Sequence, residues 1–130
     1  MPSLLWLSYS LPAEEAGNFI SAKPVTLPKG TKLYRIVDDN SNPSGSYWSL
    51  DKPKSEAEWR ARFAVKEKWN KDGKFVEYTV TDQAGIKAWV GPTSSQQAAP
   101  GAIYPGGGVQ TWVPAGTVVP AAPQSTGWRR

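Results

Sequence analysis

The spacing of apolar and polar residues predicts a chain built mainly of short strands. Strict alternation, with side chains projecting to opposite faces, predicts strands over 32–37, 46–50, 75–80, 86–90 and 109–113. The apolar pair Val118-Val119 suggests one more short strand near the end of the chain. Turn residues separate these segments, as expected when consecutive strands pair in an antiparallel sheet.

One segment has helical spacing. Ser55 and Glu58 form a capping box, and Trp59 and Phe63 follow four residues apart. Apolar residues continue at the same spacing as far as Trp69, which predicts a helix of about three turns. The predicted fold class is therefore α+β, with a compact, mainly antiparallel β core and one main helix.

The two ends of the chain differ from its middle. Residues 1–27 read as an N-terminal arm or linker, 28–119 as the folded domain and 120–130 as a C-terminal tail, because proline and glycine punctuate both ends. The apolar run 4–7 is too short to span a bilayer, and it lacks the basic lead-in and cleavage site of a signal peptide. The polar segment 93–101 is long enough to act as a flap.

Composition restricts the chemistry. The 130 residues carry a net charge of +4, which suits an acidic partner such as nucleic acid or a phosphate-bearing molecule. There is no histidine and no cysteine, which excludes Ser-His-Asp and Cys-His catalysis, thiolate zinc sites and disulfides. A reaction at this chain would use carboxylates, hydroxyls, amides, arginines and aromatic rings.

A run of three glycines leads directly into the last long strand. Gly106, Gly107 and Gly108 precede Gln110, whose side chain alternation places on the same face as that of Trp112. The commoner explanation of such a run is a turn before an edge strand. The functional explanation is a pocket with backbone as one wall and the Gln110 amide at its floor.

Three arginines fall on predicted elements. Arg35 shares a strand face with Leu33 and Val37, so its side chain either extends to solvent or holds an anion with its forked guanidinium. Arg60 and Arg62 lie on the predicted helix, and either could be an ordinary solvated residue.

The order of these pieces resembles the tuberculosis-necrotizing-toxin family of NAD(P) glycohydrolases. The resemblance rests on Leu27-Pro28-x-Gly30-x-x-x-x-Arg35, Gly45-x-Tyr47-x-Ser49, a later arginine, Trp89-Val90-Gly91 and Pro105-Gly106-Gly107-Gly108-x-Gln110. It covers 27–113, and the proline, triple glycine and glutamine string is its most specific part. The implied fold is the compact, ADP-ribosyltransferase-like fold of that family, and the implied reaction is cleavage of the nicotinamide–ribose bond of NAD or NADP.

The resemblance also assigns roles to residues. It implies that Gln110, Arg35 and Tyr47 are catalytic, with Gln110 close to the bond that breaks, Arg35 on the phosphates and Tyr47 beside nicotinamide. It implies a substrate-binding role for Arg62, with Arg60 as the second choice. The chemistry that the reaction needs adds substrate-binding roles for Trp48, Ser49, Gly106, Gly107 and Gly108. NAD+ or NADP+ would be the substrate, and neither a separate cofactor nor a metal is implied.

The family further implies a secreted or delivered effector, acting in the cytoplasm of a target cell, and a cognate immunity protein as partner. It implies neither nucleic acid as a partner nor membrane insertion by this domain. The loop 38–44 and the insertion 92–104 are longer than the family pattern, and Thr111 stands where an aromatic residue is expected after the glutamine. Three alternatives stay open: an ADP-ribosyltransferase toxin, a small basic ribonuclease toxin and a non-enzymatic binding module.

Overall fold

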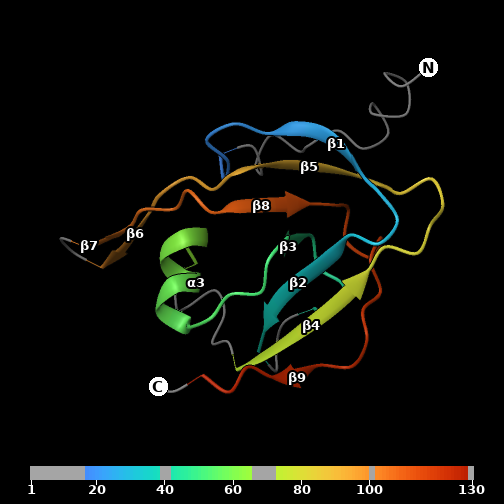
Figure 1. Cartoon of the computed structure of the whole chain (residues 1–130). Helices are drawn as coiled ribbons and strands as arrows, with labels where there is room; N and C mark the ends of the chain where they lie inside the picture. The colour runs from blue at the N-terminus through green and yellow to red at the C-terminus, as the bar shows by residue number, and fades with distance from the viewer. Residues whose placement is uncertain (1–16, 39–41, 66–72, 100–101, 129–130) are drawn as a thin grey trace.

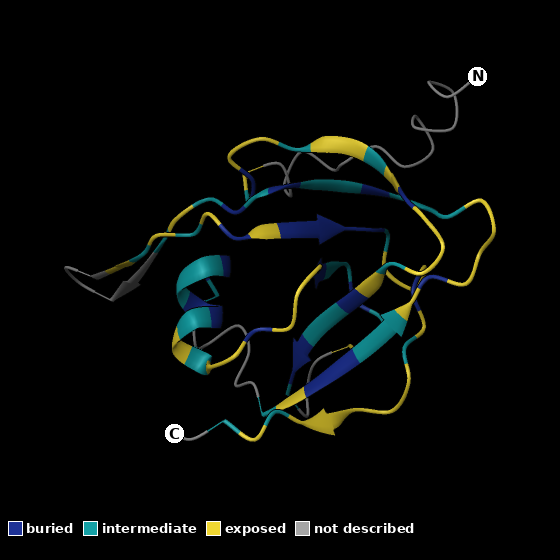
Figure 2. Ribbon diagram, viewed as in Figure 1, coloured by how far each residue is buried: buried dark blue, intermediate teal, exposed yellow. Residues whose placement is uncertain are grey.

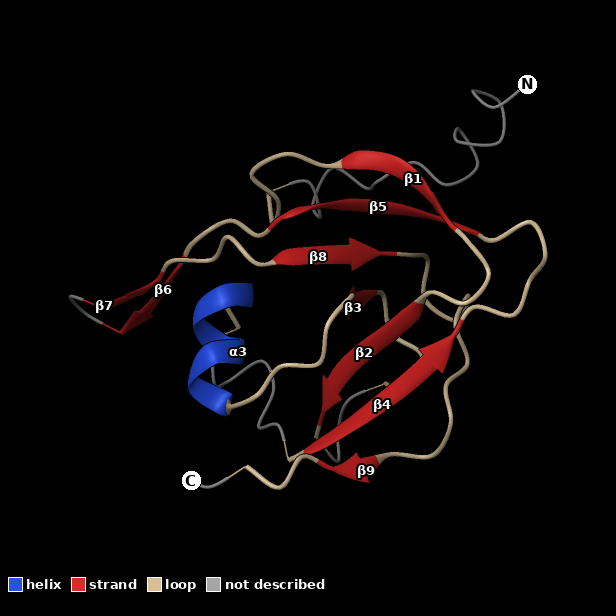
Figure 3. Ribbon diagram, viewed as in Figure 1, coloured by secondary structure: helices blue, strands red, loops and turns tan. Residues whose placement is uncertain are grey.

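The computed structural model describes residues 17–38, 42–65, 73–99 and 102–128. The elements in chain order are β1 (Lys23–Leu27), β2 (Lys32–Val37), β3 (Tyr47–Ser49), α3 (Glu56–Phe63), β4 (Lys74–Thr79), β5 (Ile86–Pro92), β6 (Gln96–Ala99), β7 (Ala102–Tyr104), β8 (Val109–Trp112) and β9 (Gln124–Ser125). Strands predominate and the described residues hold one helix, as Figure 3 shows. The α+β class predicted from the sequence is confirmed.

Seven strands form one sheet in the order β1-β5-β8-β3-β2-β4-β9, and every pair is antiparallel. In Figure 1 the strands β1, β5 and β8 lie together in the upper half, whereas β2, β4 and β9 lie in the lower half. β3 joins the halves, because it pairs with β8 on one side and β2 on the other. The strands β6 and β7 form a separate hairpin that projects past α3.

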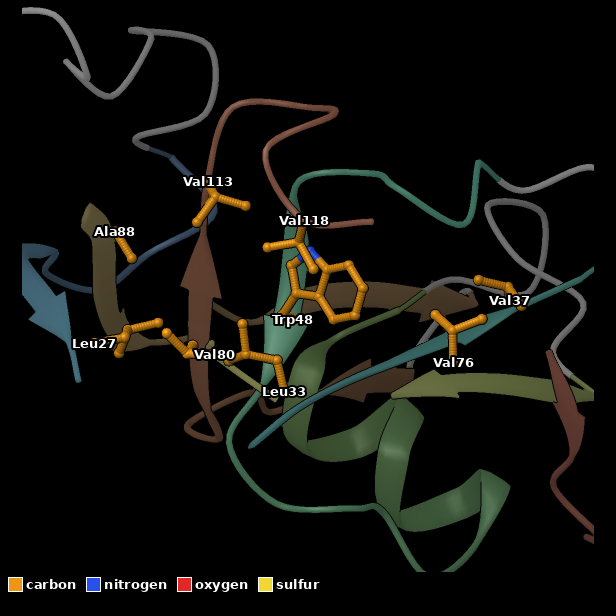
Figure 4. Packing of buried hydrophobic residues seen from close by; sticks show 9 residues of the cluster. All are labelled: Leu27, Leu33, Val37, Trp48, Val76, Val80, Ala88, Val113 and Val118. Atoms are coloured by element: carbon orange, nitrogen blue, oxygen red, sulfur yellow. The ribbon is translucent and has the colours of Figure 1, made fainter. Parts of the chain in front are cut away.

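The two faces of the sheet have different environments. One face carries the larger core, formed by Leu27, Leu33, Val37, Trp48, Val76, Val80, Ala88, Val113 and Val118. Figure 4 shows the Trp48 indole in the middle of this cluster, between Val118 and Leu33. The other face carries the side chains of Ile36 and Phe75, which pack with Trp59 and Phe63 of α3. Because strand side chains alternate, each residue of β2, β3 and β8 can be assigned to the core face or to the helix face.

The helix begins as predicted and ends early. The Ser55 side chain accepts from the Glu58 backbone N–H at 3.1 Å, which satisfies one of the first amides. Ala64 ends the helix in the left-handed conformation, with φ of 51°. The prediction of helix as far as Val65 is therefore wrong, and the remainder of that prediction, 66–69, lies outside the described residues.

The sequence missed strands at both ends. Lys23–Leu27 pairs along its whole length with β5, and Phe19 forms a bridge with Thr93. Pro24 does not interrupt β1 because an edge strand tolerates the loss of one donor. Gln124–Ser125 pairs with β4. The described parts of the predicted arm and tail thus join the sheet, and boundaries at 28 and 119 do not mark where contacts end.

Two other predictions differ from the structure. Val118 and Val119 form no strand; Val118 instead fills the core, and Val119 is exposed. The predicted flap is partly a hairpin, since β6 pairs with β7. Over the described residues, no helix is both long enough and apolar enough to cross a membrane.

Candidate functional site

Gln110 lies in the middle of the sheet, on its helix face. It pairs with Ser49 of β3 on one side and with Gly91 of β5 on the other. Because side chains alternate along β8, Gln110 points to the face opposite that of Thr111 and Val113, which are completely buried. Figure 2 shows that β8 is buried beyond its exposed first residue, and Gln110 itself is only 6% exposed.

The residue that holds the Gln110 amide comes from the predicted arm. Gln110 Nε2 donates to the backbone carbonyl of Asn18 at 2.7 Å, and the Ser94 backbone N–H donates to the same carbonyl at 3.0 Å. The side chain of Asn18 donates through Nδ2 to the Tyr47 hydroxyl at 2.8 Å. Asn18 therefore contacts both Gln110 and Tyr47, 92 and 29 residues away along the chain.

These contacts fix the orientation of the Gln110 amide. A backbone carbonyl can only accept, so the NH2 end must face Asn18 and Oε1 must point away from it. Among the described residues, Oε1 accepts no hydrogen bond. It is also not one of the completely enclosed polar atoms without a partner, of which the described residues hold one, the Thr111 hydroxyl. Oε1 is thus an acceptor directed away from Asn18 that has no hydrogen-bond donor among the described residues.

Tyr47 and Ser49 stand on the same face as Gln110. Tyr47 is half-buried, with the Phe19 ring 6.3 Å away between centroids. Ser49 is buried, and its hydroxyl lies 2.8 Å from the Asp51 carbonyl and 3.3 Å from that of Tyr34. The structure therefore brings together three of the residues that the family resemblance singled out: Gln110, Tyr47 and Ser49.

Two of the three glycines attach the helix to the start of β8. The N–H groups of Gly106 and Gly108 donate to the carbonyls of Ala61 and Arg62, each at 2.8 Å, and Gly107 donates to Thr93 at 2.8 Å. Ala61 and Arg62 would otherwise offer these carbonyls to a further helical turn, which explains why α3 stops at Phe63. All three amides donate within the protein, so the structure gives these glycines a packing role, and their predicted contact with a substrate stays a prediction.

The glycines are also required sterically. A Cβ on Gly106 would collide with the carbonyls of Thr93 and Ser94, and one on Gly108 would approach Arg62 Cβ to 3.0 Å. Gly107 has open space around it, but its φ of 89° disfavours any other residue. The close approach at Gly108 places Arg62 next to the start of β8, two residues before Gln110.

The structure distinguishes the two helix arginines. Arg62 is 37% exposed and makes ion pairs with Asp51 at 3.1 Å and Glu58 at 3.0 Å. The hydrogen bond with Asp51, followed by that with Glu58, raises the pKa of Arg62 above its ordinary value. Arg60 is 4% exposed, pairs with Glu56 at 2.8 Å and lies over the Trp59 ring. Arg62 is thus a partly exposed cation beside the site, and Arg60 is a structural residue.

Arg35 and Trp48 lie on the other face of the sheet. Arg35 has the parity of Leu33 and Val37, which are in the larger core. Its guanidinium donates to the carbonyls of Asn42 at 3.0 Å and Tyr47 at 3.1 Å, packs against Gly45, and has its pKa lowered by burial. The structure does not bring Arg35 to Gln110. Arg35 instead holds the loop before β3 against the first residue of that strand.

Trp48 is a core residue. It is 2% exposed, and its indole N–H donates to the Gly45 carbonyl at 2.9 Å. The structure therefore places Trp48 in the larger core, and its predicted substrate contact stays a prediction. The residue that sequence reasoning missed is Asn18, because nothing in the local pattern around it indicates a contact with a strand 92 residues later.

Comparisons with known proteins identify the fold. No family model matches the chain, and no curated protein matches it. Three solved structures share its fold. Tne2, solved in complex with Tni2, has 16% identity and a TM-score of 0.66 and covers 84% of this chain and 95% of its own. Rhs1-CT, solved with its cognate immunity protein RhsI1, has 21% identity, a TM-score of 0.60 and 83% coverage of both chains.

Tse6, solved in complex with Tsi6, has 11% identity and a TM-score of 0.56, and the match covers 92% of this chain and 90% of that chain. At identities of 11–21% the similarity to these three proteins is one of fold.

Proposed function

We propose that this protein is an NAD(P)+ glycohydrolase toxin that cleaves the nicotinamide–ribose bond. The observation that carries the proposal is the Gln110 amide, buried in the sheet and held by Asn18 through its NH2 end, so that Oε1 is directed away from Asn18. The family resemblance of the sequence and the shared fold with three proteins solved in complexes, one with a cognate immunity protein, support it.

The residues suit the chemistry of this bond. Its cleavage passes through a ribose with oxocarbenium character, as in glycoside hydrolysis, while nicotinamide leaves as a neutral molecule and needs no strong acid. A chain without histidine can therefore support the reaction. Oε1 of Gln110 would accept from a ribose hydroxyl or a water and orient it, and Tyr47 would line the nicotinamide side.

Arg62 would hold the pyrophosphate. It is a partly exposed arginine next to the glycine run, and a guanidinium binds phosphate oxygens in a forked geometry. Its present partners, Asp51 and Glu58, are partly solvated carboxylates, so exchange for a phosphate costs little. Arg35 is left out of the proposed site because it lies on the core face of the sheet.

The proposed setting follows from the same comparison. As a toxin, the protein would be delivered into the cytoplasm of a target cell, and the producing cell would need a cognate immunity protein. Hydrolysis is favoured over ADP-ribosyl transfer because Gln110 cannot act as the carboxylate base that would activate an acceptor.

The test is nicotinamide release from NAD and from NADP, measured separately. Wild type should release nicotinamide, and Gln110→Ala should reduce turnover by about 100-fold or more, because it removes the acceptor at the reacting ribose. Gln83→Ala is the matched control, since Gln83 is exposed in the turn between β4 and β5.

Each outcome assigns the function differently. Wild-type turnover by Gln110→Ala would contradict the assignment of the site. Release of nicotinamide with ADP-ribose attached to protein would indicate the transferase. If wild type releases no nicotinamide, total RNA is the next substrate to test. If RNA is not cleaved either, a non-enzymatic binding module is the remaining alternative.

A further inference from the structure

We propose that Asn18 is a positioning residue for Gln110 and Tyr47. This inference rests on the proposed function and adds to it that the site includes a segment preceding the region of family resemblance. Asn18 forms a hydrogen bond with each of the two side chains: its carbonyl accepts from Gln110 Nε2 and its Nδ2 donates to the Tyr47 hydroxyl.

The contacts of Asn18 act on each partner in a defined way. The main-chain carbonyl selects one of the two amide orientations of Gln110, the one that presents Oε1 away from the segment. The side-chain donor holds one lone pair of the Tyr47 oxygen, so that the phenol ring is fixed relative to Gln110. Asn18 thus sets the position of Gln110 Oε1, the proposed acceptor at the ribose, relative to the Tyr47 ring, which is proposed to lie beside nicotinamide.

Asn18 is itself held in place by the sheet. The Ser94 N–H donates to its carbonyl, and the Ile20 N–H donates to the Pro92 carbonyl at 2.9 Å. The neighbouring Phe19 is buried and forms a bridge with Thr93. The backbone of this segment therefore remains anchored when the Asn18 side chain is replaced, and the carbonyl that holds Gln110 keeps its place.

The experiment is a double-mutant cycle on nicotinamide release. Asn18→Ala should lower kcat about 3–10-fold with KM unchanged within about twofold, the effect of one hydrogen bond that positions a reacting group. In the Tyr47→Phe background, which lacks the acceptor, the same substitution should lower kcat less than about twofold. The melting temperature should fall by no more than about 5 °C, as expected for one hydrogen bond in a domain of this size.

A purely structural role gives a different result. Equal effects of Asn18→Ala on kcat in the two backgrounds would overturn the proposal. If Tyr47→Phe is too slow to measure, Asn18→Leu decides, because leucine keeps the size of asparagine without its donor: a lower kcat at unchanged KM supports the role, and an unchanged kcat overturns it.

The experiment distinguishes a failure of the proposed activity from a failure of the positioning role. If wild type releases nicotinamide and Asn18 shows no coupling to Tyr47, only the positioning role is lost. If wild type releases none, the proposed glycohydrolase activity is lost and the role of Asn18 goes with it.

Discussion

Arg35, Arg60 and Arg62 illustrate how residues of one type acquire different roles from their surroundings. Arg35 donates to two backbone carbonyls on the core face. Arg60 is buried against Glu56 and Trp59, and Arg62 is partly exposed beside the glycines. The guanidinium is the same in all three, and its partners decide whether it braces a loop, packs a helix or remains accessible to a ligand.

Thr111 offers a test of packing at a single residue. Its hydroxyl is completely enclosed and has no partner among the described residues, and the residue faces Trp48 and Val90 across the strands. Replacing it with valine keeps the shape and removes an unsatisfied polar atom, so Thr111→Val should raise the free energy of unfolding by about 1 kcal/mol or more. Chemical denaturation measures this.

The comparison for Thr111 is an exposed threonine. Thr117→Val should change the free energy of unfolding by less than about 0.5 kcal/mol, since this residue is exposed. A loss of stability in Thr111→Val would mean that the hydroxyl has a partner in solution.

The contact between the glycine run and α3 links two elements that are distant in the chain, since Gly106 donates to Ala61 and Gly108 to Arg62. This contact lies at the end of the helix and places Arg62 beside β8. Gly108 directly precedes β8, the strand that carries Gln110. The local sequence of α3 favours continuation to Trp69, but donors from a distant loop occupy its last carbonyls.

Alanine substitutions separate the two requirements on this loop. Gly107→Ala should cost about 1–2 kcal/mol of unfolding free energy, because only its positive φ of 89° opposes a side chain. Gly106→Ala should cost at least about 1 kcal/mol more, because it adds a collision with the carbonyls of Thr93 and Ser94 to a φ of 75°. Urea denaturation of the two variants measures the difference, and equal costs would contradict the docking geometry.

At the scale of the whole molecule, the sheet recruits its outer strands from both ends of the described chain. β1 comes from the predicted arm and β9 from the predicted tail. Trp128, beyond β9, lies 5.8 Å from the Trp59 ring and so helps to cover the helix. Asn18 accepts from Gln110 Nε2, so the proposed site includes a residue that precedes the region of family resemblance.

Adjacent residues test whether the arm belongs to the fold. Phe19 is 6% exposed and Ile20 is 66% exposed. Phe19→Ala should lower the free energy of unfolding by about 3–5 kcal/mol, the usual cost of removing a buried aromatic ring, whereas Ile20→Ala should lower it by less than about 0.5 kcal/mol. Thermal or urea unfolding distinguishes them, and a stable Phe19→Ala variant would place the segment outside the core.

The sequence by itself determined the elements whose pattern is local. Alternation correctly placed β2, β3, β4, β5 and β8, the capping box placed the start of α3, and strand parity put Gln110 and Trp112 on one face. The absence of histidine and cysteine limits the chemistry whatever the fold, because composition alone decides which side chains are present. The placed elements each follow from residues close together in the chain.

Only the tertiary structure decided which of these pieces meet. Arg35 and Trp48 lie on the face of the sheet away from Gln110, and the glycine run donates hydrogen bonds to α3. Asn18 forms hydrogen bonds with Gln110 and Tyr47. Strand parity assigns a face within one strand, but it does not fix which face of the next strand lies beside it. That relation depends on register and on contacts between distant segments, which are set when the whole sheet packs.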